Sequence, residues 1–569
     1  MTRLRRDQIF HGRLPWWTLL LAALASAPVD AQLLPGIGDA LRDAEKTRPQ
    51  PPPQTQPRLD VDRPAPPAPG APDAPGFRVE RIRLTGVTVL PEAELVEILK
   101  PYAGRDLTLD DLNQAAAEIT RLYRVRGYPV ARAYVPAQTI RDGVVELAVL
   151  EGRYGELSVR VDAALSGRLA DEAVRALRPG EVIAEDALNR ALLLLDDLGG
   201  VAARGTLRPG ARPGTADLVI DVTGTPRFGG TLSADNFGSE LTGRYRLGAG
   251  FHAHNLAGQG DTLAARALVA ERADLAYGQV AYDVPLNGDG LRAGAIGTYT
   301  SYTLGETLSA LGATGYAGIA TAYVRYAIVR SRRGSLYAQL ALDAKRIEDK
   351  IAAAGAFNPR KESVATITVH GDAPDRDPVR GVTSSSFAIA GGRLNIEDPT
   401  ALAIDQATTR REGGFAKLNY SLARVQSVGR RLQLYGAVSG QLASKNLDPV
   451  EKFSLGGPLG VRAYPTGEAP GDTGILGTLE ARYALPAPDF PGIVQAVAFI
   501  DSGTVQLDKR PFTPAPNHRT LTGAGIGVNV FARSGLQLTV SYAWALGDER
   551  GSEDPDRTSR GWIQFVHSF

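Results

Sequence analysis

Few side chains in this sequence could carry out covalent or metal chemistry. None of the 569 residues is cysteine, which excludes disulfides, thiol nucleophiles and cysteine-ligated zinc or iron–sulfur sites. His252 and His254 would share a strand face, but two imidazoles without a third ligand make a weak metal site. The glycines of 523–527 resemble part of a nucleotide loop, yet no helix follows, so glycines on one strand face are the better interpretation. With no GxSxG, HExxH or P-loop motif, we expect no enzyme activity, no catalytic residue, no metal and no cofactor.

The composition restricts the class of protein further. Lys and Arg total 63 and Asp and Glu total 62, so the formal net charge is +1. A nucleic-acid binder that relies on a bulk basic field is therefore disfavoured. Hydrophobic residues make up 43% of the chain, which is enough to fold.

Residues 1–31 have the pattern of a secretory signal peptide. A basic leader containing Arg3, Arg5, Arg6 and Arg13 precedes an apolar run from Leu14 to Ala27, and small residues flank a cleavage site after Ala31. A retained membrane anchor is the alternative, but the run is shorter than the ~20 residues that a spanning helix needs. We therefore expect export.

The next segment combines a short helix with a long tether. Within 32–47, Leu33, Leu34, Ile37 and Leu41 recur at helical spacing, which predicts one amphipathic helix. Residues 48–76 contain eleven prolines and cannot pack a core, so they are expected to be extended. A helix on such a tether is either a terminus that associates non-specifically with other surfaces or a removable plug.

Two similar α+β units follow, at 77–153 and 154–226. Each has the expected order β-α-α-β-β, and the sequence DALN at 186–189 echoes DDLN at 110–113. Neither unit contains a catalytic cluster. A strand edge beside a helix would instead suit the binding of an extended peptide by strand addition.

Residues 227–569 read as antiparallel strands with one apolar face. In Leu536–Leu546, apolar and small polar residues alternate over the 9–11 residues of a tilted membrane-crossing strand. A soluble sandwich or propeller would alternate too. The export signal, strand pairs repeating over roughly 40 residues and an aromatic C-terminus favour a transmembrane β-barrel of about 16 strands. Phe565 and Phe569 look like the C-terminal signal for outer-membrane insertion.

Taken together, these parts resemble a two-partner secretion transporter of the ShlB/FhaC/HecB haemolysin secretion and activation family (TpsB type, Omp85 superfamily). The α+β repeats look like its POTRA domains, and Asp235–Gly243 with Arg246 looks like its opening hairpin. Two motifs carry most of the resemblance. The first motif consists of Val461, Arg462, Ala463 and Tyr464 and is similar to the family's lumen loop. The second consists of Phe499, Asp501 and Gly503 and is similar to the family's FxDxG strand.

The resemblance implies that Arg462 meets Asp501 inside the barrel as a bidentate ion pair. Ala463 stands where the family has glycine. If that position needs a positive φ, Ala463 would be strained by about 1 kcal/mol.

The resemblance also implies a function. Such a protein sits in the bacterial outer membrane with its POTRA domains in the periplasm. It translocates, with activation left open, a large secreted exoprotein of TpsA haemolysin/haemagglutinin type. The other implied partners are outer-membrane lipid and the barrel-assembly machinery. Nucleic acid is not an expected partner. The expected oligomeric state is a monomer. An Omp85-type barrel-assembly factor is the alternative, and a passive porin is a third possibility that would not need the repeats.

Overall fold

The computed structural model describes residues 36–38, 40–41, 58–61, 76–162, 164–375 and 381–569. The signal peptide, Leu34 and most of the proline-rich segment lie outside the described residues. Within the described part of the chain, no helix is both long enough and apolar enough to cross a membrane.

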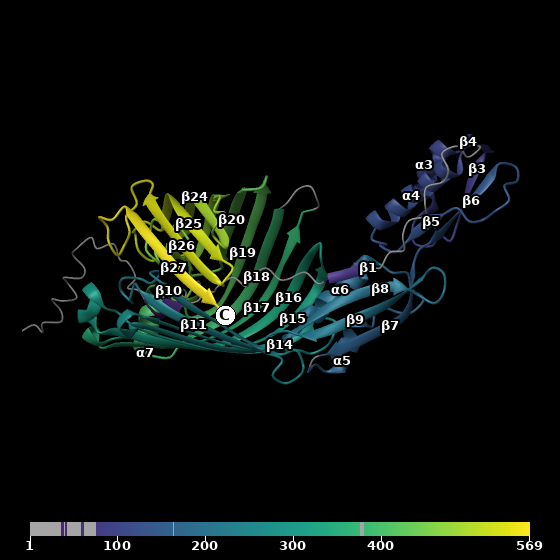
Figure 1. The fold of residues 1–569 in the computed structure, drawn as a ribbon. Helices are drawn as coiled ribbons and strands as arrows, with labels where there is room; N and C mark the ends of the chain where they lie inside the picture. Colours follow the sequence, from purple (N-terminus) through teal and green to yellow (C-terminus); the bar gives the residue numbers. More distant parts are fainter. Residues whose placement is uncertain (1–35, 39, 42–57, 62–75, 163, 376–380) are drawn as a thin grey trace, which may run out of the picture.

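The C-terminal part of the chain is a closed antiparallel β-barrel (Figure 1). Each strand pairs with its sequence neighbour, and the last strand closes the ring against the first. This confirms the predicted barrel and its number of strands. The sixteen strands are β10 (Phe228–Asp235), β11 (Arg246–His254), β12 (Thr262–Ala270), β13 (Leu275–Pro285), β14 (Leu291–Thr303), β15 (Ala313–Ser331), β16 (Gly334–Ile351), β17 (Ala356–Pro374), β18 (Gly381–Ile396), β19 (Gly413–Val428), β20 (Leu432–Ala443), β23 (Thr473–Ala484), β24 (Gly492–Gln506), β25 (His518–Ala532), β26 (Leu536–Ala545) and β27 (Ser559–Ser568).

The two faces of the barrel wall differ as the alternation requires. In β26, the large side chains Val540, Tyr542 and Trp544 are exposed on the outside, while Ala543 between them is buried. A strand has a side-chain period of two, so this pattern leaves an apolar outer surface. The strands range from 8 residues in β10 to 19 in β15, so one side of the wall is much taller than the other.

The ring closes at the seam between β10 and β27. Residues Thr231–Asp235 pair with Gln564–Ser568. The C-terminal residue extends the seam, because the backbone N–H of Gly230 donates to Phe569 O at 2.9 Å and the Phe569 N–H donates back to Gly230 O at 3.0 Å. Phe565 and Phe569 are both exposed, on the apolar side of β27 and at its end.

The first repeat packs two helices against a small sheet. Its elements are β2 (Phe77–Val79), β3 (Arg81–Thr85), α3 (Glu92–Leu99), η1 (Lys100–Tyr102), β4 (Arg105–Leu107), α4 (Leu109–Val125), β5 (Arg132–Tyr134) and β6 (Val144–Leu150). Thr108 begins α4 with a capping box. Buried Glu151 accepts hydrogen bonds from Thr88, Val89 and Tyr123. Burial alone would raise the pKa of Glu151, but these donors outweigh it and hold that pKa below its usual range.

The second repeat has the predicted order β-α-α-β-β and one additional strand from outside the repeat, whereas the first repeat departs from that order by the short pair β2–β4. It consists of β7 (Arg153–Asp162), α5 (Gly167–Val174), α6 (Glu185–Asp196), β8 (Val201–Pro209) and β9 (Thr215–Gly224). In both repeats the strand just before the helices (β3 or β7) runs parallel to the last strand (β6 or β9), and the strand just after the helices (β5 or β8) runs antiparallel to it. The additional strand, β1 (Arg58–Val61), comes from the tether and pairs in parallel with the edge strand β8.

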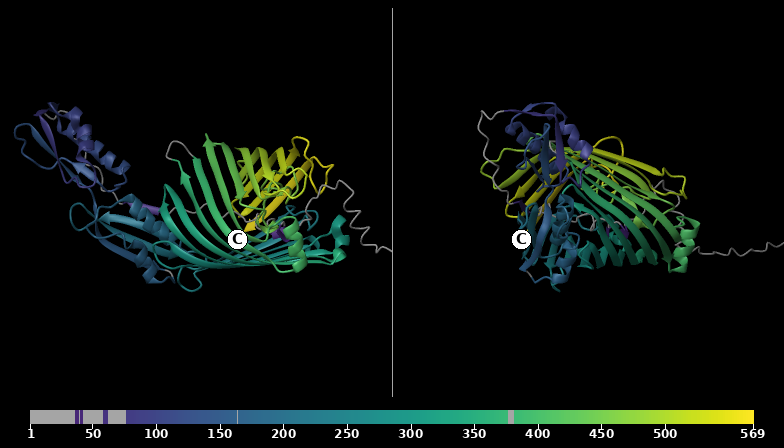
Figure 2. Two further views of the ribbon diagram at one scale, coloured as in Figure 1. Left: turned by 180° about the vertical axis from the view of Figure 1, so that it is seen from behind. Right: turned by 90° about the vertical axis from the view of Figure 1, so that its right-hand side faces the viewer.

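The second repeat is fixed to one end of the barrel, and the first lies beyond it (Figures 1 and 2). Arg330 of β15 makes a bidentate bridge to Asp197 at 2.7 and 2.8 Å. The backbone N–H of Gly288, in the β13–β14 turn, donates to Glu172 at 3.0 Å. These contacts identify the strand turns on this side as the repeat end of the barrel.

Asp196 makes the stability of the second repeat depend on pH. Burial raises the pKa of its carboxyl to about 6, even though a hydrogen bond from the Ala203 N–H opposes the shift. The folded state therefore holds the proton more tightly than the unfolded state, and stability falls as pH rises from about 4 to 6 and is constant above. We expect Asp196→Asn to raise the free energy of unfolding of the detergent-solubilised protein by about 1–2 kcal/mol at pH 8, measured as a higher unfolding temperature. At pH 4 the substitution should leave the unfolding temperature unchanged. An equal effect at both pH values would contradict this assignment.

Candidate functional site

The segment between β20 and β23 folds back into the barrel instead of extending away from it. Residues 444–472 contain η5 (Pro449–Glu451) and the strand pair β21 (Phe453–Ser454) and β22 (Pro470–Gly471). Their apolar side chains pack against the inner wall of β23–β26. The cluster comprises Leu455, Val461, Ala463, Tyr464, Ala469, Leu476, Val497, Phe499, Val505, Leu521 and Ala543. A long loop buried in this way needs polar partners on the wall for its backbone and charges.

The structure brings Arg462 and Asp501 together at the centre of this cluster. The Arg462 side chain donates from Nε to Asp501 Oδ2 and from Nη2 to Oδ1, both at 2.8 Å. Its backbone N–H donates to Oδ2 at 3.2 Å. Asp501 is fully buried, and Thr478 donates a further hydrogen bond at 3.0 Å. The planar fork of arginine matches a carboxylate in this arrangement, so the pair fixes both the position and the orientation of the loop.

Three more side chains hold Arg462, and sequence reasoning identified only one of them, Phe499. The ring of Phe499 lies beneath the guanidinium with its centroid 3.3 Å from Cζ, and Glu480 accepts from Nη1 at 2.7 Å. On β27, Trp562 Nε1 donates to the backbone carbonyl of Arg462 at 2.7 Å. Glu480 was visible in the sequence as an acidic residue on a mostly uncharged strand, whereas Trp562 gave no signal.

The backbone at Ala463 is not strained. This residue is not among those with positive φ, so the conditional cost of an alanine at this position does not arise. Its side chain faces Gly523 of β25, where an added Cβ would lie 2.7 Å from the Ala463 Cβ. Gly503 serves the same purpose for Leu455, whose Cδ2 would lie 2.6 Å from an added Cβ. Gly523, one of the glycines interpreted as lying on a strand face, and Gly503 of the FxDxG motif thus make room for the loop.

The described part of the N-terminal helix also lies inside the barrel (Figure 2). Ile37 and Leu41 are buried, and the Ile37 N–H donates to Asp349 at 3.2 Å. On the other side of the helix, Gly38 lies against the backbone of Pro449. The wall of this site is formed by the halves of β12–β16 farthest from the repeats: Leu268, Ala270, Leu275, Tyr277, Tyr302, Leu304, Ala313, Ala317 and Ile347.

Ion pairs fasten η5 to the adjoining part of the wall, on β16, β17 and β19. Glu451 contacts Lys345, which also lies 3.0 Å from Glu362, and Glu451 lies 2.7 Å from Lys417. All four side chains are mostly buried. Buried charges need such partners, because an unpaired one costs several kcal/mol. The described part of the N-terminal helix and the loop therefore occupy the barrel lumen in contact with each other, and each is held by hydrogen bonds or ion pairs to the wall.

A comparison with known families decides what this closed barrel is. Residues 214–530 match the model described as haemolysin secretion/activation protein ShlB/FhaC/HecB, and residues 77–152 match the POTRA domain of ShlB type. The chain belongs to this family. It is an outer-membrane transporter that moves a partner exoprotein through its barrel, with POTRA domains in the periplasm. The repeat end of the barrel is therefore periplasmic, and the loop 444–472 starts from the extracellular end.

Individual relatives agree with this assignment. The chain is 29% identical over 483 residues to the heme/hemopexin transporter protein HuxB of Haemophilus influenzae, covering 84% of each chain. It is 22% identical over 480 residues to the outer membrane transporter CdiB of Escherichia coli, covering 82% of this chain and 78% of the relative. A solved structure of CdiB from Escherichia coli superposes with a TM-score of 0.68 at 19% identity, over 89% of this chain and 93% of that one.

The other predicted residues lie on the first two strands of the barrel, β10 and β11. Arg246 and Asp235 of the opening hairpin face each other on β11 and β10 and form a buried ion pair at 2.8 Å. His252 and His254 have ring centroids 4.9 Å apart, and His254 Nδ1 lies 3.2 Å from Thr262 Oγ1. No group of three metal-ligating side chains occurs among the residues that the structure describes.

Proposed function

We propose that this transporter exports one large, extended exoprotein of haemolysin/haemagglutinin type, and that it opens by releasing two elements from its lumen. The helix of 32–47 acts as the plug, and the loop 444–472 acts as the gate, held by the latch Arg462–Asp501. The observation that carries this proposal is the lumen itself, because both elements are anchored on the wall by hydrogen bonds and ion pairs and neither is a strand of the barrel. No enzymatic step is part of this function.

The test compares secreted and outer-membrane proteins with and without the transporter. Loss of one large exoprotein from the medium supports the proposal. Broad loss of other barrel proteins from the outer membrane would instead favour the assembly factor, and altered solute uptake alone would favour a porin. The transporter is proposed to function as a monomer whose apolar outer face contacts lipid after insertion by the barrel-assembly machinery.

The periplasmic repeats, proposed as POTRA domains at 77–153 and 154–226, would receive the partner as an added strand. In the first repeat, the outer edge of β5 is partly used, since the Ala133 N–H donates to Thr120 of α4 at 2.9 Å. In the second repeat, the corresponding edge is β8, and β1 occupies it. An edge that already accepts an extended segment of this chain is suited to an extended segment of a partner. We therefore propose that the partner replaces β1 on β8.

A disulfide between β1 and β8 should block export. Asp60 and Thr206 are direct partners in the parallel register, at a spacing that a disulfide can bridge. Because the chain has no cysteine of its own, Asp60→Cys with Thr206→Cys creates one defined pair. Oxidised protein should secrete about tenfold less exoprotein than the same protein after reduction.

The matched control uses the same position in β8. Thr206 also faces Val219 of β9, a strand pair that no step separates, so Thr206→Cys with Val219→Cys should export equally when oxidised or reduced. Undiminished export by the fully oxidised Asp60/Thr206 pair would show that β1 does not have to leave.

A further inference from the structure

The segment 445–451 connects the plug to the outside of the barrel. At its inner end, an added Cβ on Gly38 of the plug would lie 2.3 Å from the carbonyl carbon of Pro449 and 2.5 Å from the Val450 nitrogen. The plug and η5 are thus in direct backbone contact. Any displacement of this segment toward or away from the lumen axis must change the space that the plug occupies.

A chain of buried ion pairs runs from the plug to this segment. Asp349 accepts the hydrogen bond from the Ile37 N–H and also binds Arg360 Nη2 at 2.6 Å. Arg360 Nε in turn lies 2.9 Å from Asp448 Oδ2. Arg360 and Asp448 are each 2% exposed. In so dry an environment the loss of one member leaves its neighbour as an uncompensated buried charge, which is strongly destabilising.

The outer end of the segment is attached to the extracellular loop between β18 and β19. This loop, 397–412, contains α7 (Pro399–Ala407). Asn446 Nδ2 donates to the carbonyl of Thr409 at 2.7 Å, and Lys445 Nζ donates to the carbonyl of Glu412 at 2.7 Å. Arg411 Nη1 lies 3.9 Å from Asp448. Three contacts therefore tie the turn 408–412 to 445–448.

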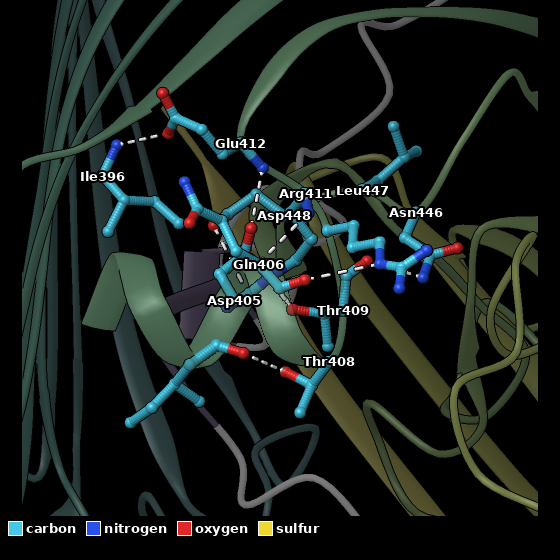
Figure 3. Close-up of polar contacts among 12 residues, drawn as sticks. Ile396, Asp405, Gln406, Thr408, Thr409, Arg411, Glu412, Asn446, Leu447 and Asp448 are labelled. Carbon is cyan, nitrogen blue, oxygen red and sulfur yellow. Dashed lines mark hydrogen bonds and ion pairs between the residues drawn. The ribbon is translucent and has the colours of Figure 1, made fainter. Parts of the chain in front are cut away.

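Asp405 organises that turn (Figure 3). Its carboxylate, 1% exposed, accepts hydrogen bonds from the Thr409 hydroxyl, from the backbone N–H groups of Arg411 and Glu412 at 3.1 and 3.0 Å, and from Arg411 Nε at 3.0 Å. These donors outweigh burial, which alone would raise the pKa of Asp405, and hold that pKa below its usual range. The carbonyls that receive Asn446 and Lys445 belong to the same turn.

We propose that Asp405 is a positioning residue for the plug, acting from the extracellular surface through the turn 408–412 and the segment 445–451. Its side-chain hydrogen bonds lie within the turn 408–412 and not on the described residues of the plug. By fixing the turn, it holds Asp448 and Pro449 against Arg360 and the helix, so that the plug stays seated until export begins. The proposal rests on the proposed role of residues 32–47 as the plug.

The test measures ion conductance of the full-length protein in planar bilayers. Asp405→Asn keeps the size of the side chain but removes the charge that gathers four donors. We expect the fraction of time in the open state to rise about tenfold. Arg411→Ala, which removes one of those donors and the contact to Asp448, should change conductance in the same direction, and Arg411→Lys should restore part of the closure. The shift in mobility of unheated protein on electrophoresis verifies that each barrel is folded.

Asp398→Asn is the matched control. Asp398 caps α7 in the same loop by accepting from the Ala401 N–H at 2.8 Å, at the opposite end of the helix from the turn 408–412. This change removes the same charge from the same loop while the asparagine still caps the helix, so conductance should stay at the wild-type level. Equal opening by Asp398→Asn and Asp405→Asn would overturn the proposal, because loss of any carboxylate charge from this loop would then be sufficient.

Combining Asp405→Asn with a deletion of 32–47 tests whether Asp405 acts through the plug. If Asp405 acts through the plug, Asp405→Asn adds nothing to the conductance of the deletion variant. An additive increase would mean that the substitution widens the pore directly, and the positioning role would be wrong. If the deletion itself leaves conductance unchanged, the plug assignment fails first and the inference fails with it. If the deletion opens the channel and Asp405→Asn does not, only the inference fails.

Discussion

Replacing Asp501 by arginine is expected to reduce export of the partner at least a hundredfold. The substitution removes three hydrogen bonds to Arg462 and places two guanidinium groups side by side in a buried site. Breaking a buried pair in this way costs about 3–5 kcal/mol and leaves the loop without its main polar anchor. The loop tip would leave the wall of β24 and could not return to it, whereas the proposed gate has to move between its seated and released positions during export. The measurement is the amount of exoprotein in the medium relative to folded transporter in the outer membrane.

A charge reversal tests whether the pair itself is responsible. Arg462→Asp alone should also impair export, because it brings a further carboxylate next to Asp501 and Glu480. When Arg462→Asp is combined with Asp501→Arg, the guanidinium on β24 would again face acidic groups, so we expect partial recovery. Thr478→Val removes a single 3.0 Å hydrogen bond to Asp501 and should have little effect. Normal export by either single charge variant would exclude a role for the latch in secretion.

The barrel was predictable because its wall repeats one local pattern. The alternation in Leu536–Leu546 reports directly which side chains face out, since a strand's period of two links sequence to surface without reference to distant residues. The capping of α4 by Thr108 is likewise local. Both depend on neighbours in the sequence and could be read from the residues alone, whereas the short strand β4 between the helices of the first repeat, which pairs with β2, was not predicted.

The lumen contacts were not predictable in this way. The pairing of Arg462 with Asp501 came from family resemblance, and two of its other partners, Glu480 and Trp562, lie 18 and 100 positions from Arg462. The residues near a buried charge in the sequence do not indicate which distant charge will form an ion pair with it. The same holds for the placement of β1 on the second repeat, which depends on an edge 146 residues away.

Replacing Gly38 by alanine is expected to open the channel. The added methyl would lie 2.3–2.5 Å from the backbone of Pro449 and Val450, and a backbone cannot move aside as a flexible side chain can. Overpacking of this kind costs about 1–3 kcal/mol, which shifts the ratio of released to seated plug by roughly 5- to 150-fold. Alanine favours a helix more than glycine does, so the change acts on the seat of the plug and not on the helix itself. Single-channel recordings of the full-length protein in planar bilayers measure the open fraction.

Gly36→Ala, two residues away, provides the control. An added Cβ at this position would meet the Asp349 carboxylate at 3.6 Å, which is ordinary van der Waals contact, so the plug should remain seated and the conductance should match the wild type. Both variants make the same chemical change in the same short segment, and they differ only in what the methyl group meets. If both variants open the channel, the N-terminal segment is sensitive to any added methyl group. If the Gly38→Ala channel stays closed, η5 moves aside to accommodate the methyl group and does not hold the helix in place.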